Sequence, residues 1–238
     1  MGKNVAIVLS AGSGRRMNSK TKKQYLLINE KPVVYYSLKA FQECGIIDEI
    51  VLVTSEEDMD YCRTEIVEKY DFSKVNTICP GGKERYNSVF NGLSAVRDCD
   101  YVFIHDGARP FITDEILKRA YSVLQECGSA VVGMPVKDTI KIADENLDVL
   151  DTPNRKSVWQ VQTPQCFEYN MAMEAYDFLI KEEKSGELSK RGIQVTDDAM
   201  VVETFGGSKV RLVEGSYENI KITTPEDLSI AELFVREL

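Results

Sequence analysis

Short apolar runs alternate with longer amphipathic segments along most of the chain. The alternation predicts an α/β fold in which a largely parallel sheet is covered by helices. Strands are predicted at residues 5–9, 49–54, 75–79, 101–104, 130–135, 158–161 and 209–213. Helices are predicted at residues 33–43, 56–70, 86–96, 114–127, 169–184 and 197–205, with Thr196 as the cap of the helix at 197–205, and a last helix begins at Pro225 behind Thr224.

Residues 137–154 depart from this alternation. Polar and apolar positions alternate weakly on both sides of a turn-like segment at 144–146, which is typical of a hairpin that projects from the main body. No linker rich in proline, glycine or serine and no internal repeat divides the sequence. We therefore expect a single domain over residues 1–238, with a projecting β-arm at about 137–155.

Composition excludes several classes of protein. Of the 238 residues, 43% are hydrophobic and 28% are charged, as in globular proteins that do not enter the membrane. No apolar run approaches the ~20 residues of a membrane span, and the N-terminus lacks a signal-peptide pattern. The net charge of −9 argues against nucleic-acid binding, and six scattered cysteines favour reduced thiols in a cytoplasmic protein.

The N-terminal strand leads into a turn of small residues, Ser10 to Gly14, and then into a block of cations, Arg15, Arg16, Lys20, Lys22 and Lys23. Residues 1–29 contain six basic residues and no acidic one, although the whole chain has 29 basic against 38 acidic residues. Such a turn lets backbone N–H groups approach a polyphosphate. The spacing matches neither the dinucleotide fingerprint nor the P-loop, so a purely structural turn remains an equal alternative at this point.

Five further segments carry candidate chemistry. Asp106, after the strand at 101–104, could bind Mg²⁺ or pair with an arginine to fix its loop. Residues 81–85 with Ser88 could contact a base edge or form a strand-to-helix turn. Residues 162–165 and 196–199 place hydroxyls and carboxylates in apparent loops. Lys221 stands between two isoleucines, as a functional group or as a snorkelling side chain.

Taken together, these segments resemble the 2-C-methyl-D-erythritol 4-phosphate cytidylyltransferases. The resemblance spans almost the whole chain and rests on the motifs S-A-G-S-G-R-R-M, K-Q-Y-L, G-G-K-E-R-Y-N-S-V, H-D-G-A-R-P, K-D-T-I-K, W-Q-V-Q-T-P-Q-C-F, T-D-D-A and N-I-K-I-T-T-P-E-D-L. Ser10 departs from the family, whose members often have alanine there. Ribitol-5-phosphate cytidylyltransferase shares several motifs, but Ala108, Lys137-Asp138-Thr139 and Trp159 are more similar to the methylerythritol enzymes.

The resemblance implies a Rossmann-like sheet of the nucleotidyltransferase type that transfers CMP from CTP to 2-C-methyl-D-erythritol 4-phosphate, in non-mevalonate isoprenoid synthesis. A ribitol-5-phosphate cytidylyltransferase and an inactive nucleotide-binding protein are the alternatives. The attacking phosphate monoester is already anionic near neutral pH because its second pKa is about 6, so no general base is required. The reaction needs cations that relieve charge repulsion and stabilise the α-phosphate transition state.

The residues that match the family's positions divide by role. The resemblance assigns catalysis to Arg16 and Lys23, and a divalent cation such as Mg²⁺ to Asp106. It implies a homodimer in which the arm completes the partner's site. The residues implied for CTP are Ser10, Ala11, Gly12, Gly14, Lys23, Gly82, Lys83, Ser88, Asp106 and Gly107, with Gly82, Lys83 and Ser88 reading cytosine. The residues implied for the sugar phosphate are Arg109, Thr139, Arg155, Thr163, Thr196 and Lys221.

Overall fold

The computed structural model describes residues 2–12 and 21–235. Within these residues the main sheet has seven strands in the order β11-β7-β10-β6-β1-β4-β5. Strand β10 is antiparallel to both of its neighbours, and the other pairs are parallel. The mostly parallel sheet predicted from the sequence is therefore confirmed. The strands are β1 (Asn4–Ser10), β4 (Glu49–Thr54), β5 (Val75–Pro80), β6 (Tyr101–Asp106), β7 (Ser129–Pro135), β10 (Trp159–Glu168) and β11 (Leu212–Glu214).

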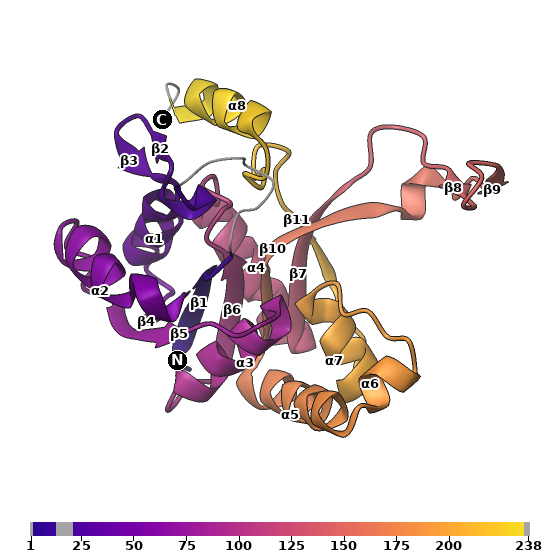
Figure 1. Ribbon diagram of the computed structural model, residues 1–238, viewed down its shortest axis with the longest axis horizontal. Helices are drawn as coiled ribbons and strands as arrows, with labels where there is room; N and C mark the ends of the chain where they lie inside the picture. Colours follow the sequence, from indigo (N-terminus) through magenta and orange to yellow (C-terminus); the bar gives the residue numbers. More distant parts are fainter. Residues whose placement is uncertain (1, 13–20, 236–238) are drawn as a thin grey trace.

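Helices cover both faces of this sheet (Figure 1). One face packs against α1 (Val33–Glu43), α4 (Asp114–Cys127) and the helical segment η3 (Glu56–Asp58), α2 (Met59–Tyr61) and η4 (Cys62–Glu68). The opposite face packs against α3 (Arg85–Ala95), α5 (Tyr169–Ser185) and α7 (Asp198–Gly206). Because side chains alternate along a strand, Ala6 and Val8 of β1 enter the first core while Val5 and Ile7 enter the second. Both faces of β1 are thus buried, as its continuous apolar run predicts.

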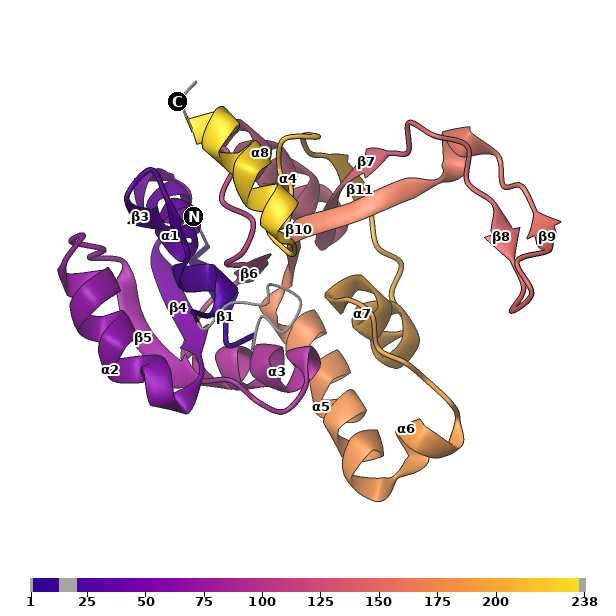
Figure 2. The same cartoon turned by 45° about the horizontal axis from the view of Figure 1, so that its top comes forward.

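A third, smaller core lies at the C-terminal end of the chain. Helix α8 (Pro225–Val235) contacts β2 (Leu27–Ile28), which pairs with β3 (Lys31–Pro32). Buried Ile28, Ile222 and Ala231 pack together there. Figure 2 shows α8 beside the β2–β3 hairpin. This packing anchors the segment that carries Lys221 against the body of the protein.

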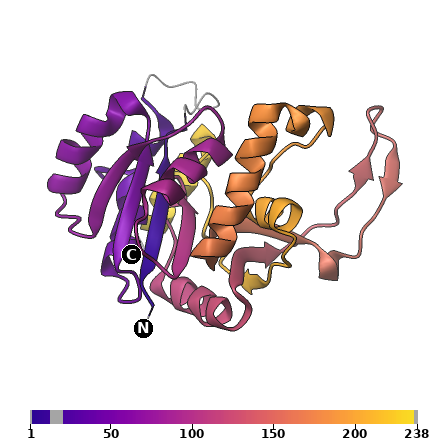
Figure 3. The same cartoon turned by 90° about the horizontal axis from the view of Figure 1, so that it is seen from below.

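The arm predicted at about 137–155 extends away from the sheet (Figure 3). Its short strands β8 (Ile142–Ala143) and β9 (Val149–Asp151) pair antiparallel around the turn predicted at 144–146. Four of its apolar side chains are exposed: Ile142, Leu147, Val149 and Leu150. The arm therefore has no core of its own within this chain.

Three local predictions were wrong. Residues 196–199 were expected in a loop, but Asp198 and Ala199 begin α7. Residues 162–165 lie in β10 rather than in a loop, because buried Gln162, Thr163 and Gln165 satisfy their side chains by tertiary hydrogen bonds. A register shift separates Val161 from Gln165 in the pairing with β7. Thr196 does not cap α7. The cap is Asp197, whose carboxylate accepts a hydrogen bond from the backbone nitrogen of Met200 at 3.0 Å.

Candidate active site

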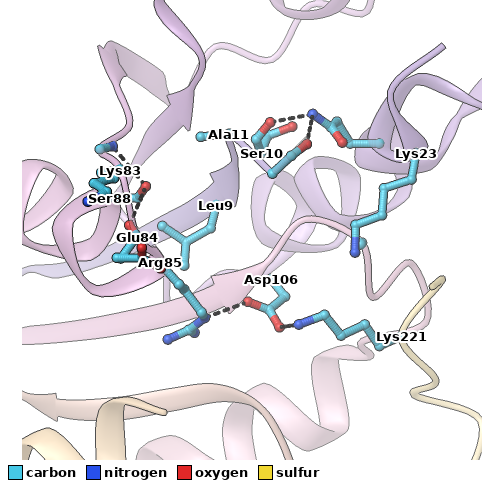
Figure 4. Close-up of a pocket in the computed structure, with 14 residues that line it drawn as sticks. Leu9, Ser10, Ala11, Lys23, Lys83, Glu84, Arg85, Ser88, Asp106 and Lys221 are labelled. Carbon is cyan, nitrogen blue, oxygen red and sulfur yellow. Dashed lines mark hydrogen bonds and ion pairs between the residues drawn. The ribbon is translucent and has the colours of Figure 1, made fainter. Parts of the chain in front are cut away.

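A cavity of about 420 Å³ lies at the sheet edge where β1 and β6 end (Figure 4). The carboxyl ends of parallel strands are the usual position of ligand sites in open α/β sheets. The lining includes nine of the residues implied for binding or catalysis: Ser10, Ala11, Gly12, Lys23, Gly82, Lys83, Ser88, Asp106 and Lys221. It also includes Leu9, Gln24, Glu84, Arg85 and Ala108. Segments from both ends of the sequence thus meet in one site.

The two glycine segments pack directly against each other in this cavity. A Cβ atom added at Gly81 would lie 2.4 Å from the Cβ of Ala11, so the strand-to-helix loop can approach the first turn only without a side chain there. The backbone nitrogen of Gly82 donates to Ser88 Oγ at 3.0 Å, and the backbone nitrogen of Glu84 donates to Asn87 Oδ1 at 3.0 Å. The loop is therefore both the structural start of α3 and one wall of the cavity.

Adjacent lysines at the end of the basic block point to different places. Lys22 donates to Ser55 Oγ at 2.8 Å and to Asp58 Oδ2 at 2.7 Å, and it also pairs with Glu57. Its charge is neutralised outside the cavity. Lys23, the first residue of the short 3-10 turn η2 (Lys23–Tyr25), lines the cavity (Figure 4). Lys23 is therefore the described cation of this block that faces the cavity.

A chain of ion pairs crosses the floor of the cavity (Figure 4). Arg85 donates from Nε to Asp106 Oδ1 at 3.1 Å, and from Nη1 and Nη2 to the two oxygens of Asp198 at 2.7 and 2.8 Å. Lys221 donates to Asp106 Oδ2 at 2.6 Å. Asp198 is fully buried and also accepts a hydrogen bond from Tyr176. The bidentate geometry fixes the guanidinium plane, which in turn orients the Asp106 carboxylate.

The charge of Asp106 is maintained despite its burial. Burial alone would raise the pKa of this carboxyl, but Arg85 and Lys221 hold the pKa well below its usual range. The sequence offered an arginine partner for Asp106 as one alternative. The structure supplies that partner from α3, whereas Arg109 donates from Nη1 to the Asn219 carbonyl at 2.8 Å.

The backbone of Asp106 is held by a second, buried chain of hydrogen bonds. Its nitrogen donates to Thr163 Oγ1 at 3.1 Å, and that hydroxyl lies 3.1 Å from His105 Nδ1. His105 Nε2 lies 3.1 Å from the Arg109 carbonyl, which can only accept, so Nε2 carries the proton and the Thr163 hydroxyl donates to Nδ1. Burial lowers the pKa of His105 to about 4 and keeps the imidazole neutral.

A second cavity, of about 340 Å³, shares a wall with the first. Arg85, Asp106 and Lys221 line both cavities. The remaining wall of the second cavity contains three more residues implied for the sugar phosphate, Arg109, Thr163 and Thr196. Its other lining residues are Val161, Gln162, Gln165 and Asp197.

The structure does not bring every implied residue to these cavities. Thr139 and Arg155 are exposed on the arm, and neither is among the residues that line these two cavities. Gly107 is buried and is not a lining residue of either cavity; its nitrogen donates to the Leu9 carbonyl at 2.8 Å. Gly14 and Arg16 lie outside the described residues.

Arg85, Asp198 and Gln24 make hydrogen bonds that shape this site, and none of the three was assigned a role from the sequence. Arg85 and Asp198 lie in the G-G-K-E-R and T-D-D-A segments, but 113 positions separate them, so no local spacing indicates their pairing. Gln24 follows Lys23 and is 2% exposed. A glutamine between two residues of a short turn carries no signal of burial by itself.

Asp106 could hold a divalent cation only together with a phosphate ligand. No cluster of three or more His, Cys, Asp or Glu side chains suited to a metal occurs in residues 2–12 and 21–235. Both oxygens of Asp106 already accept from cations. Magnesium commonly uses one or two carboxylates plus substrate phosphates, so the donor set fits Mg²⁺ that arrives with a triphosphate.

Comparisons with known proteins agree with this geometry. The family model described as 2-C-methyl-D-erythritol 4-phosphate cytidylyltransferase matches residues 4–237. A protein of that name from Clostridium perfringens (strain SM101 / Type A) is 48% identical over 236 residues, covering 99% of this chain and 100% of the relative. One from Lachnospira eligens is 48% identical over 233 residues, covering 98% and 99%.

Solved structures show the same fold. The crystal structure of 4-diphosphocytidyl-2C-methyl-D-erythritol synthase from Anaerococcus prevotii matches with a TM-score of 0.83 and 34% identity, covering 98% of this chain and 96% of that chain. The 2-C-methyl-D-erythritol 4-phosphate cytidylyltransferase from Francisella tularensis matches with a TM-score of 0.78 and 29% identity, covering 97% and 99%.

Proposed function

Because this chain belongs to the 2-C-methyl-D-erythritol 4-phosphate cytidylyltransferase family, we propose that it transfers CMP from CTP to 2-C-methyl-D-erythritol 4-phosphate. The products are 4-CDP-2-C-methyl-D-erythritol and pyrophosphate, in the synthesis of isoprenoid precursors without mevalonate. The ribitol-5-phosphate alternative is not favoured, since the matching family model and the relatives carry the methylerythritol name.

The observation that carries the proposal is the pair of cavities with a common wall. The first is lined by Ser10, Ala11, Gly12 and Lys23, which suit a triphosphate, and the second is lined by Arg109 and Thr196. Two anionic substrates in these cavities would meet at Arg85 and Lys221. A phosphate oxygen of the acceptor would then attack the α-phosphorus of CTP, and the bond from that phosphorus to the pyrophosphate oxygen would break. This step needs no general base.

In this proposal Lys23, together with Arg16, stabilises charge that develops on the α-phosphate. Ser10, Ala11, Gly12 and Gly14 bind the triphosphate. Gly82, Lys83 and Ser88 read cytosine, whose amino group distinguishes it from uracil. Ser88 also fixes the loop, since its Oγ accepts from the Gly82 nitrogen and donates to the Glu84 carbonyl at 3.3 Å.

Mg²⁺ or another divalent cation belongs to the proposal, with Asp106 as its protein ligand. When bound, it would neutralise charge on the triphosphate oxygens. Arg85 and Lys221 supply positive charge around the same carboxylate and keep it ionised. Removal of divalent cations with a chelator is expected to weaken CTP binding more than cytidine binding, a comparison that does not depend on turnover.

A homodimer with shared sites is also proposed. The exposed apolar side chains of the arm support it, as does the position of Thr139 and Arg155 outside both cavities of their own chain.

A cytoplasmic location is supported by the six cysteines, all of which are free thiols. The structure has no helix in its described part that is long and apolar enough to cross a membrane.

Pyrophosphate release measured with CTP and 2-C-methyl-D-erythritol 4-phosphate tests the proposed function. The wild-type protein should turn over this pair, and Lys23→Ala should lower kcat by ~10²-fold, as expected for loss of an electrostatic donor, with a smaller effect on CTP affinity. Ribitol 5-phosphate and UTP serve as the competing substrates. Faster turnover of ribitol 5-phosphate, or tight CTP binding without turnover, would overturn the proposal.

A further inference from the structure

Gln24 is a buried polar residue of the first cavity to which the reaction assigns no role. It is the middle residue of the 3-10 turn that begins at Lys23, and it is 2% exposed. Its Nε2 lies 2.6 Å from the carbonyl oxygen of Ser10 and 3.1 Å from that of Gly12. A single side-chain nitrogen therefore links Ser10, at the end of β1, to Gly12.

We infer that Gln24 is a positioning residue that holds the turn from Ser10 to Gly12 in the conformation that binds the triphosphate. The inference rests on the proposed function for the identity of that ligand. A carboxamide nitrogen has two hydrogens, and Gln24 directs them at two carbonyl oxygens of one turn. In a trans peptide the N–H points opposite to the C=O. The Ser10 carbonyl and the Ala11 N–H belong to the same peptide, so holding the carbonyl toward Gln24 points the N–H away from Gln24.

Ser10 and Gln24, which a hydrogen bond links, each also have a buried polar side-chain atom without a partner among the described residues. Gln24 Oε1 and Ser10 Oγ are completely buried, and neither has a hydrogen-bond partner within the described part of the chain. Both residues line the cavity. Buried polar atoms without partners are costly, and in native structures most such atoms are paired. Such a cost in free energy is characteristic of a turn whose conformation is kept for function.

Other residue types could not replace this arrangement. Glutamate is nearly isosteric, but its ionised carboxylate only accepts and would face two carbonyl oxygens as well as a triphosphate. Methionine fills a similar volume without a donor. Lysine would donate but would bring a charge into a buried position. The neutral, doubly donating carboxamide is the group that the two carbonyls require.

The test compares Gln24→Met with wild type and with Gln42→Met. Gln42 also makes two side-chain hydrogen bonds, donating to Ser73 Oγ and accepting from the Lys74 nitrogen, both at 2.9 Å, so its substitution is a matched control away from the cavities. Calorimetry should show CTP affinity reduced about tenfold or more in Gln24→Met, from the loss of one to two hydrogen bonds. Cytidine affinity should change less than about threefold, since the base contacts lie on the other loop.

Gln24→Glu provides a second test with a pH readout. At pH 8 the carboxylate should weaken CTP binding more than methionine does. Protonation restores one donor, so the ratio of variant to wild-type dissociation constant should fall as the pH is lowered toward 5.5. Protonation of CTP changes both dissociation constants by the same factor at a given pH, so it cancels in the ratio.

The outcomes separate this inference from the proposed function. If wild-type protein binds no CTP, the proposed function fails whatever the variants do. If wild type binds CTP and Gln24→Met binds it equally well, or loses CTP and cytidine affinity in the same proportion, Gln24 is only a structural residue and the inference is overturned. A pH-independent ratio for Gln24→Glu would also contradict it.

Discussion

Lys221 Nζ lies 2.6 Å from Asp106 Oδ2, and this ion pair forms part of the wall that the two cavities share. The local sequence explains why the lysine can reach it. Ile222 is buried against α8, and its nitrogen donates to the Ala108 carbonyl at 2.8 Å, so the adjacent Lys221 is directed to the opposite side, toward Asp106. The apolar neighbours of Lys221 are therefore its anchor.

Replacing Lys221 should weaken binding of the sugar phosphate more than binding of CTP. In Lys221→Met we expect KM for the sugar phosphate to rise by ~30-fold, since a charge-assisted hydrogen bond contributes about 2 kcal/mol. CTP affinity should fall by less, because Arg85 still pairs with Asp106, although it shares its charge with Asp198. Steady-state kinetics with each substrate varied measures both effects. Lys118→Met, which removes an exposed lysine paired with Asp114 on α4, is the control, and a larger loss for CTP than for the sugar phosphate would contradict the assignment.

Breaking the Arg85–Asp198 pair should destabilise the protein. Asp198 is fully buried, so Arg85→Met leaves an uncompensated carboxylate beside Tyr176 and should lower the free energy of unfolding by about 3–5 kcal/mol. Asp198→Asn in the same chain removes that charge and should recover part of the loss. Urea unfolding of both single variants and the double variant measures the coupling. Additive losses would show that the two side chains act independently.

Much of this fold is readable from the sequence, whereas the pairing within the site is not. The apolar run before Ser10 specifies β1 through local chemistry. Helix α4 is likewise specified by its cap, Thr113, whose hydroxyl accepts from the Ile116 nitrogen at 3.4 Å. The polar side chains of Gln162 and Thr163 indicated an exposed loop. Their hydrogen-bond partners, Ser216 and His105, are distant in sequence, so the local sequence did not show that these side chains are buried and paired. Burial of polar residues depends on such tertiary partners, and a single sequence does not contain them.

Neutral His105 should make stability depend on pH in a defined window. Burial lowers its pKa in the folded protein from 6.5 to about 4, so between these values the unfolded chain binds the extra proton. The contribution of neutral His105 to the free energy of unfolding is fully present above pH 6.5. It is lost as the pH falls toward 4, by up to about 3 kcal/mol. Urea unfolding at several pH values should show a flatter profile for His105→Gln. An equal slope in both proteins over that window would exclude His105 as the cause.

The last prediction concerns the arm, where Arg155 donates to the Lys137 carbonyl at 3.0 Å and otherwise projects from the arm as an exposed side chain. If the arm completes the site of a second copy, the core and the arm of one active site come from different chains. Lys23→Ala then disables the core side and Arg155→Ala the arm side. Each homodimer should be nearly inactive, because every one of its sites carries one lesion.

Mixing the two variants distinguishes shared from separate sites. A hybrid dimer with exchanged arms has one doubly damaged site and one intact site. Random exchange of equal amounts makes about half of the dimers hybrid, so activity should recover to about a quarter of the wild-type value. If each arm serves its own chain, every site in the hybrid keeps one lesion and no activity returns. Subunit exchange is verified separately with differently tagged chains, so absence of recovery would reject the shared site rather than reflect failed mixing.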